Sequence, residues 1–191
     1  MNALMTVLYF LFSLFFNIVI YALWIRLGLH FLKFSTLHPV SQLIYTITNP
    51  LVNPIKKLLS KKQQMRTAID WSTVITLIIM EFLKFVLIGL FFFGQLFPII
   101  YILIFMIADL LVQPLNLLFY MILIRVIMSW IQPDWRHPVN DVLRAFTNPL
   151  LRLGHSLVPN ISGFDFSPFI ILILLKVLTL FISASLPISL I

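Results

Sequence analysis

Four charged residues interrupt stretches of the sequence that are otherwise strongly apolar: Glu81, Lys84, Asp109 and Lys176. Carboxylates and amines can exchange protons, attract ions or pair with one another. In a membrane a lone charge costs about 2.5–3.5 kcal/mol on insertion scales, so each of these side chains needs a partner or contact with water. Ionic chemistry inside the apolar segments is therefore the first possibility that the sequence raises.

Glu81 and Lys176 hold equivalent positions in two copies of one unit. They lie 95 residues apart, which is also the offset between Asp70 and Asp165. Each would lie about 12–14 Å from the start of its segment if that segment is a helix. Equivalent positions meet when both face the axis that relates the copies, so the repeat predicts a buried Glu81–Lys176 ion pair. Lys84 is a competing partner for Glu81, because residues i and i+3 share a helix face.

Asp109 begins a stripe of polar residues at helical spacing. Gln113, Asn116 and Tyr120 follow it at i+4, i+7 and i+11. Such a stripe within a membrane either joins helices or lines a water-filled path. We expect it to join helices, with the water-filled path as the alternative.

Two arginines and two aspartates recur near the ends of the apolar segments. Arg26 and Arg125 come shortly before a segment ends, and Asp70 and Asp165 stand where the next one begins. Arginine can extend its charge to the membrane surface, and aspartate can cap a helix N-terminus. The alternative is a clamp within each copy, Arg26 with Asp70 and Arg125 with Asp165, through a bidentate ion pair. Either role is structural.

The elements that must position these residues form an internal repeat. Residues 21–51 and 120–150 share a tyrosine, an arginine, a His-Pro pair and Thr-Asn-Pro-Leu at a constant offset of 99. A long-period repeat of this kind indicates that one structural unit is used twice. We therefore divide the chain into a first repeat, 1–98, and a second, 99–191.

The composition indicates a membrane protein. Hydrophobic residues make up 61% of the chain and charged residues 10%, with a mean hydropathy of +1.08, whereas soluble domains are about half apolar and a quarter charged. A bilayer span takes about 20 apolar residues, and four segments are long enough: 3–32, 71–93, 99–131 and 168–191. The predicted fold is all-α, a polytopic membrane protein with four transmembrane helices built as two parallel repeats.

The basic residues predict the topology. Lysine and arginine concentrate in the loops 33–70 and 132–167, and the short turn at 94–98 has none. The positive-inside rule then places both loops in the cytoplasm and both termini outside, in what we expect to be a bacterial inner membrane. Anionic headgroups beside these loops account for the net charge of +7, so we do not expect nucleic acid as a partner.

Each long loop is expected to contain an amphipathic helix. Apolar residues follow helical spacing at Val40, Leu43, Ile44 and Ile47, and again at Val139, Val142, Leu143 and Phe146. We predict a short helix that breaks at Thr-Asn-Pro, where Asn49 and Asn148 would cap a second helix. It would lie in the membrane interface with its apolar side toward lipid. A re-entrant loop is the alternative.

Sites for cofactors and catalysis are not expected. The chain has no cysteine, which excludes disulfides and thiolate metal sites. Its four histidines do not form an i,i+4 pair that suggests a metal. Intramembrane catalysis needs a placed acid and base or a nucleophile, and we find no such constellation. The chain is therefore not expected to be an enzyme.

The chain resembles the YggT family. The features that carry the resemblance are an arginine near the end of the first helix, His-Pro, an amphipathic run, Thr-Asn-Pro and an Asp-aromatic-Ser helix start, all of them repeated. The resemblance covers nearly the whole chain and implies a small bacterial inner-membrane protein with relatives in plastids. It further implies links to osmotic-stress tolerance, ion homeostasis and membrane-complex assembly or division, with no catalytic residue to carry over.

Two functions are compatible with this sequence. The first is a non-enzymatic protein that organises partners or lipid at the cytoplasmic face. Anionic headgroups would contact basic residues there, at about 1 kcal/mol per residue; the candidates are Lys56, Lys57, Lys61 and Lys62. The second is an ion-transport component or channel subunit that uses the intramembrane charges. Four spans leave little room for a monomeric pore, so transport would need a homo-oligomer or membrane-protein partners.

Overall fold

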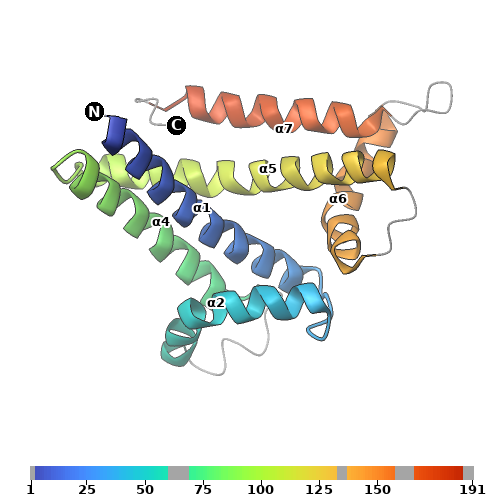
Figure 1. The fold of residues 1–191 in the computed structure, drawn as a ribbon, viewed down its shortest axis with the longest axis horizontal. Coiled ribbons are helices and arrows are strands. Elements are labelled where there is room, and N and C mark those ends of the chain that lie inside the picture. Colours follow the sequence, from blue (N-terminus) through green and yellow to red (C-terminus); the bar gives the residue numbers. More distant parts are fainter. Residues whose placement is uncertain (1–2, 60–68, 133–136, 158–165, 187–191) are drawn as a thin grey trace. The chain divides into compact units, whose positions relative to one another are not determined.

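The computed structural model describes residues 3–59, 69–132, 137–157 and 166–186, and these residues are entirely helical in their regular structure. In chain order the helices are α1 (Ala3–Phe31), α2 (Pro39–Leu58), α4 (Trp71–Phe92), α5 (Ile99–Ile131), α6 (Pro138–Leu157) and α7 (Ser167–Ala184) (Figure 1). Of these, α1, α4, α5 and α7 are long and apolar enough to cross a membrane. The predicted all-α, multi-pass architecture is confirmed.

A tight turn joins α4 to α5. Gly94 has a φ of +66°, a left-handed conformation that glycine adopts without strain. The backbone amides of Phe93 and Gln95 both donate to the carbonyl oxygen of Gly89, each over 3.2 Å. The turn folds back so closely that a Cβ on Gly89 would lie 2.9 Å from the Gln95 carbonyl oxygen. The short turn expected between these two spans is therefore present.

The helices pack as two compact units. The first unit contains residues 1–37 and 41–111, and the second contains 38–40 and 112–191. The division falls inside α5, close to Pro114, whereas the repeat boundary proposed from the sequence lies between residues 98 and 99. One long helix thus contributes its first part to one unit and its second part to the other.

The core of the first unit forms where α1, α2 and α4 meet. Leu23, Val52 and Leu77 are buried together there, one from each helix. Farther along, α1 and α4 lie side by side in antiparallel directions, with the Tyr9 and Phe92 rings 5.3 Å apart (Figure 1). The Phe85 ring stacks on Phe105 of α5 at 5.8 Å. The inner face of α4 is consequently enclosed by α1 and the first part of α5.

The core of the second unit joins α5, α6 and α7. Its buried residues are Ile122 of α5, Leu151 of α6, and Ile171, Leu172 and Leu175 of α7. The helices α6 and α7 approach closely at Gly154, where a Cβ would lie 3.0 Å from the Ser167 Cβ atom. A glycine at this position therefore permits the contact between the two helices.

The helices of the long loops are continuous, and the predicted break at Thr-Asn-Pro is wrong. Pro50 and Pro54 lie inside α2, and Pro149 lies inside α6. A proline inside a helix removes one backbone hydrogen bond and bends the axis, and α2 changes direction along its length in Figure 1. Asn49 does not start a second helix, because its side-chain oxygen accepts a hydrogen bond from an arginine instead.

The apolar side of α2 is exposed. Leu43 and Ile47 are 60% and 54% exposed, whereas Ser41 and Thr48 on the opposite side are buried. A soluble protein buries the apolar side of an amphipathic helix, so the arrangement in α2 is reversed. It is the arrangement expected of a helix whose apolar side faces lipid.

The second loop helix, α6, differs from this pattern. Val142 and Leu143 belong to the stripe that the sequence predicts to face lipid, yet both are buried in the protein. The prediction for this stripe is therefore wrong at these two positions. The repeated pattern of apolar residues does not by itself decide which neighbour covers them.

Candidate functional site

Arg26 connects three helices of the first unit. Its side chain leaves α1 and is almost fully buried. One guanidinium nitrogen, Nη1, donates to Thr48 Oγ1 at 2.8 Å and to Asn49 Oδ1 at 2.9 Å, both on α2. The Nε atom lies 3.6 Å from Asp70 Oδ2 at the start of α4. We call Arg26, Thr48 and Asn49 the Arg26 anchor.

Asp70 has both of the roles that the sequence suggests. It caps α4, since its Oδ1 accepts from the Thr73 backbone amide at 3.3 Å and its Oδ2 accepts from the Thr73 hydroxyl at 2.6 Å. It also pairs with Arg26, through one contact rather than the expected bidentate pair. Burial alone would raise the pKa of Asp70, but the hydrogen bonds from Ser72 and Thr73 and the charge of Arg26 together lower this pKa below its ordinary value.

The second unit has an equivalent anchor, which we call the Arg125 anchor. Nη1 of Arg125 donates to Thr147 Oγ1 at 2.6 Å and to Asn148 Oδ1 at 2.7 Å. The Thr147 hydroxyl in turn donates to the Leu143 carbonyl oxygen at 2.7 Å. Asp165, the partner predicted for Arg125, lies outside the described residues.

Sequence reasoning did not find the threonine and asparagine acceptors of these anchors, although the signal is present. Thr48 and Asn49 are displaced from Thr147 and Asn148 by 99 residues, and Arg26 is displaced from Arg125 by the same number. A pair of polar residues that keeps a fixed offset with an arginine is a candidate for binding it.

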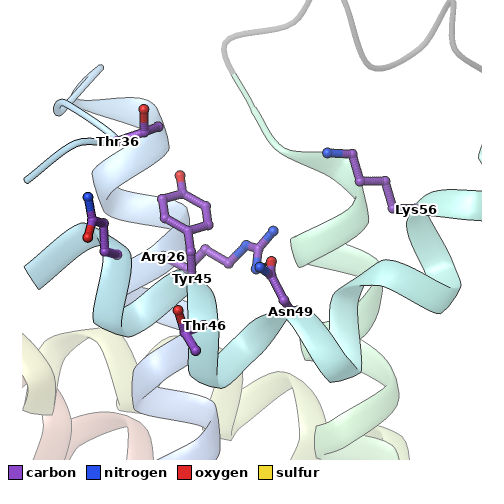
Figure 2. Close-up of a pocket in the computed structure, with 7 residues that line it drawn as sticks. Arg26, Thr36, Tyr45, Thr46, Asn49 and Lys56 are labelled. Carbon is purple, nitrogen blue, oxygen red and sulfur yellow. The ribbon is translucent and has the colours of Figure 1, made fainter.

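A polar recess opens beside the Arg26 anchor. One cavity of about 470 Å³ is lined by Arg26, Tyr45, Asn49 and Lys56 among others (Figure 2). A second, of about 370 Å³, shares Arg26, Tyr45 and Lys56 and extends to Asp70. The Tyr45 ring centre lies 4.6 Å from the Arg26 guanidinium carbon. We call these two cavities together the Arg26 recess.

Two of the four predicted lipid-facing lysines are described. Lys56 and Lys57 stand near the end of α2, and both are exposed. Lys56 contributes to the lining of the Arg26 recess, while Lys57 does not line either of its cavities. Lys61 and Lys62 lie outside the described residues.

A second polar group lies within the membrane-spanning part of the first unit. Lys84 of α4 forms a hydrogen-bonded ion pair with Asp109 of α5. Its Nζ atom also lies 3.5 Å from Glu81 Oε2 and donates to Asn17 Oδ1 of α1 at 3.2 Å. Exposure is 0% for Glu81, 5% for Lys84 and 8% for Asp109. We call these four residues the Lys84 cluster.

The structure shows one of the two partners that the sequence offers Glu81. Glu81 is paired with Lys84, the local alternative, on the face of α4 that also meets α1 and α5. Lys176 belongs to the second unit, and its pairing with Glu81 stays a prediction. Asp109 joins two helices, as expected for its stripe, whereas Tyr120 at the other end of the stripe is exposed.

Comparison with known proteins gives one family. The family described as CCB3/YggT matches the chain twice, at residues 5–91 and 100–186. The uncharacterised protein YggT of Escherichia coli is 30% identical over 179 residues, which is 92% of this chain and 89% of that protein. An uncharacterised protein of Vibrio alginolyticus from the proC 3' region is 27% identical over 91% of this chain and 89% of its own length. No solved structure matches the chain.

Proposed function

The chain belongs to the CCB3/YggT family, and we propose that it is a non-enzymatic membrane protein that binds anionic lipid headgroups at the Arg26 recess. It would thereby organise lipid, and partners that require such lipid, at the cytoplasmic face of a bacterial inner membrane. Osmotic-stress tolerance or the assembly of membrane complexes is the setting in which we propose that this activity is used.

The observation that carries this proposal is the chemistry of the recess. Arg26 and Lys56 supply positive charge against a single carboxylate, Asp70, and Tyr45 and Asn49 add polar groups. Phosphate oxygens accept hydrogen bonds from such donors and are attracted by the charge. The exposed apolar side of α2 supports a position in the interface. A recess along that helix would then lie at the depth of the headgroups.

Two neighbouring lysines allow a matched test. The protein would be placed in nanodiscs with equal amounts of phosphatidylglycerol and phosphatidylcholine, and the lipid that it retains would be counted by native mass spectrometry. Lys56→Gln should reduce retained phosphatidylglycerol about fivefold, the equivalent of about 1 kcal/mol per basic residue near an anionic surface. Lys57→Gln, one residue outside the recess, should have a much smaller effect. Equal effects, or no preference for phosphatidylglycerol, would contradict a specific site.

The orientation within the membrane forms part of this proposal. Because the chain has no native cysteine, single cysteines can be placed at Lys57 and at Gln95, which are both exposed. A membrane-impermeant maleimide should label Gln95→Cys in intact cells and Lys57→Cys only in permeabilised cells. The reverse pattern would overturn the cytoplasmic assignment of α2.

An ion-transport component is the second candidate, and the Lys84 cluster favours it. Buried ionisable residues within membrane helices commonly mark ion or proton pathways. Flux through proteoliposomes that depends on Glu81 would support this candidate. A cluster that affects unfolding but leaves flux unchanged would support a role in joining helices.

A further inference from the structure

We infer that the Lys84 cluster is a proton-binding site, with Glu81 as the residue that carries the exchangeable proton. This inference does not rest on headgroup binding at the Arg26 recess. It names the ion for the second candidate function, although proton binding can be tested without any measurement of transport.

The first argument is the charge of the cluster. It contains two carboxylates, Glu81 and Asp109, and one amine, Lys84, all of them at least nine-tenths buried. Asn17, the residue that α1 contributes, is neutral. If all three ionisable groups were charged, the cluster would carry one net negative charge that is not balanced by another described residue of the first unit. A buried ion without a partner is strongly unfavourable, and such a group usually becomes neutral instead. One bound proton makes the cluster neutral.

The second argument identifies the carboxylate that holds this proton. Asp109 accepts a direct hydrogen bond from Lys84, which stabilises the charged form of both groups. Glu81 is fully buried, and neither of its carboxylate oxygens has a hydrogen-bond partner in the structure. Its Oε2 approaches Lys84 Nζ no closer than 3.5 Å. Glu81 is therefore the carboxylate with the weaker support for a negative charge.

The third argument separates a proton from a metal cation. A metal ion bound by Glu81 Oε2 would lie close to the Lys84 ammonium group and would be repelled by it. Hard cations also require several oxygen ligands, whereas in the Lys84 cluster the buried oxygens that lack a hydrogen-bond partner are the two of Glu81. A proton needs only one oxygen, and the neutral acid that forms is not repelled by Lys84.

The surroundings of Glu81 contain few other charges. The groups that act on it electrostatically are Lys84 on the same helix and Asp109 on α5. From α1 the cluster receives the neutral Asn17. Protonation is thus governed by a balance between one amine and two carboxylates, and this balance changes when either partner of Glu81 is replaced.

The composition of the chain permits a test without mutation, because Glu81 is its only glutamate. Protein labelled with carbon-13 at the glutamate side-chain carboxyl, in lipid nanodiscs, would report this one group by infrared difference spectroscopy and by solid-state NMR. At neutral pH we expect the signal of a protonated acid that shifts in deuterated water and converts to carboxylate as the pH is raised. A carboxylate signal at neutral pH would overturn the inference.

Two variants then test the charge balance. Asp109→Asn leaves one carboxylate and one amine, so the labelled Glu81 should convert to carboxylate at neutral pH. Glu81→Gln resembles the neutral acid in shape and charge and should remove the protonated-acid band of the unlabelled protein while the protein still folds. A protonated Glu81 in Asp109→Asn, or a band that persists in Glu81→Gln, would contradict the assignment. If either variant fails to fold, the pH titration of the labelled wild-type protein decides alone.

Discussion

The two repeats are alike at their loop helices and different within their membrane-spanning helices. Each has an arginine that donates to a threonine and an asparagine on the following loop helix, over 2.6–2.9 Å. For the Lys84 cluster, the described residues of the second repeat form no such counterpart. At the position that corresponds to Glu81 the second repeat has the exposed Lys176, and at that of Lys84 it has Thr179, which bonds to its own helix.

This difference separates the contacts that both repeats need in order to fold from the contacts that are found in one repeat only. A feature present in both copies, such as the anchors, is expected to be required by the shared architecture. A buried cluster of three charged groups in one copy cannot be required by that architecture, because the other copy is built without it. We therefore regard the hydrogen bonds of the anchors as structural, distinct from the headgroup binding proposed for the Arg26 recess beside them, and the Lys84 cluster as a specialised feature of the first repeat.

The anchors offer the largest expected effect. Arg26→Ala removes the hydrogen-bond donor of Thr48 and Asn49 and the ion-pair partner of Asp70, and truncating one partner of a buried ion pair costs about 3–5 kcal/mol. Arg125→Ala should also destabilise the protein, if the anchors are equivalent. Unfolding in detergent titrations, followed by circular dichroism, would measure both. A stable Arg26→Ala protein would contradict the structural role, and an effect in one repeat only would break the equivalence.

The charged residues in the middle of the membrane should give the next largest effect. Lys84→Met leaves Glu81 and Asp109 without a cation. We expect a loss of about 2 kcal/mol, less than for Arg26, because with Glu81 already protonated one further proton, on Asp109, makes the remaining pair neutral. The control is Lys176→Met, at an exposed position, which should leave the unfolding free energy nearly unchanged. Equal losses in the two variants would remove the distinction between the repeats.

A pair of matched variants, one in each repeat, tests whether the two anchors are equal in strength. Thr48→Val and Thr147→Val each remove the hydroxyl that accepts a hydrogen bond from an arginine, while keeping the shape of the side chain. The bond that each hydroxyl donates to a carbonyl one turn earlier in its own helix is lost as well, but such a bond adds little to stability. A hydrogen bond to a charged group contributes about 1.5 kcal/mol, so both variants should lose about this amount in the same unfolding titration. Thr46→Val, at an exposed position on α2, is the control for the exchange of a hydroxyl for a methyl group. Losses that differ by more than twofold would show that the anchors are not equivalent.

Much of the helical architecture could be predicted from the sequence, because membrane spans depend on length and hydropathy alone. The helix at 99–131 is predicted with its observed bounds, and the tight turn before it was expected from its length. The anchors depend on contacts between helices. A Thr-Asn-Pro sequence indicates a helix start by local rules, but Arg26 engages Asn49 and the helix continues.

The partner of Glu81 could not be decided from the repeat for a related reason. An offset of 95 residues shows that Glu81 and Lys176 are equivalent, but it carries no information on which way each helix is rotated. Lys84 and Asp109 both stand out in the sequence as charged residues within apolar segments. Their pairing depends on how α4 and α5 pack against one another, which the sequence pattern does not specify.

The smallest expected effect concerns Asp70 and its dependence on pH. The pKa of Asp70 is lower in the folded protein than its ordinary value, so its stabilising contribution is present above the unfolded pKa of about 3.9 and is lost as the pH falls through the folded pKa. Asp70→Asn keeps a capping side chain but loses the negative charge, so it should be less stable than wild type at neutral pH by about 0.5–1 kcal/mol, the usual contribution of a charge near a helix N-terminus. The difference in unfolding free energy should shrink in acid.

The control is Asp141→Asn, which removes an exposed carboxylate near the start of α6 in the second repeat. Asp70 is half-buried and Asp141 is exposed, so Asp141→Asn should change the unfolding free energy less. A gap between wild type and Asp70→Asn that widens in acid would contradict the ion pair with Arg26.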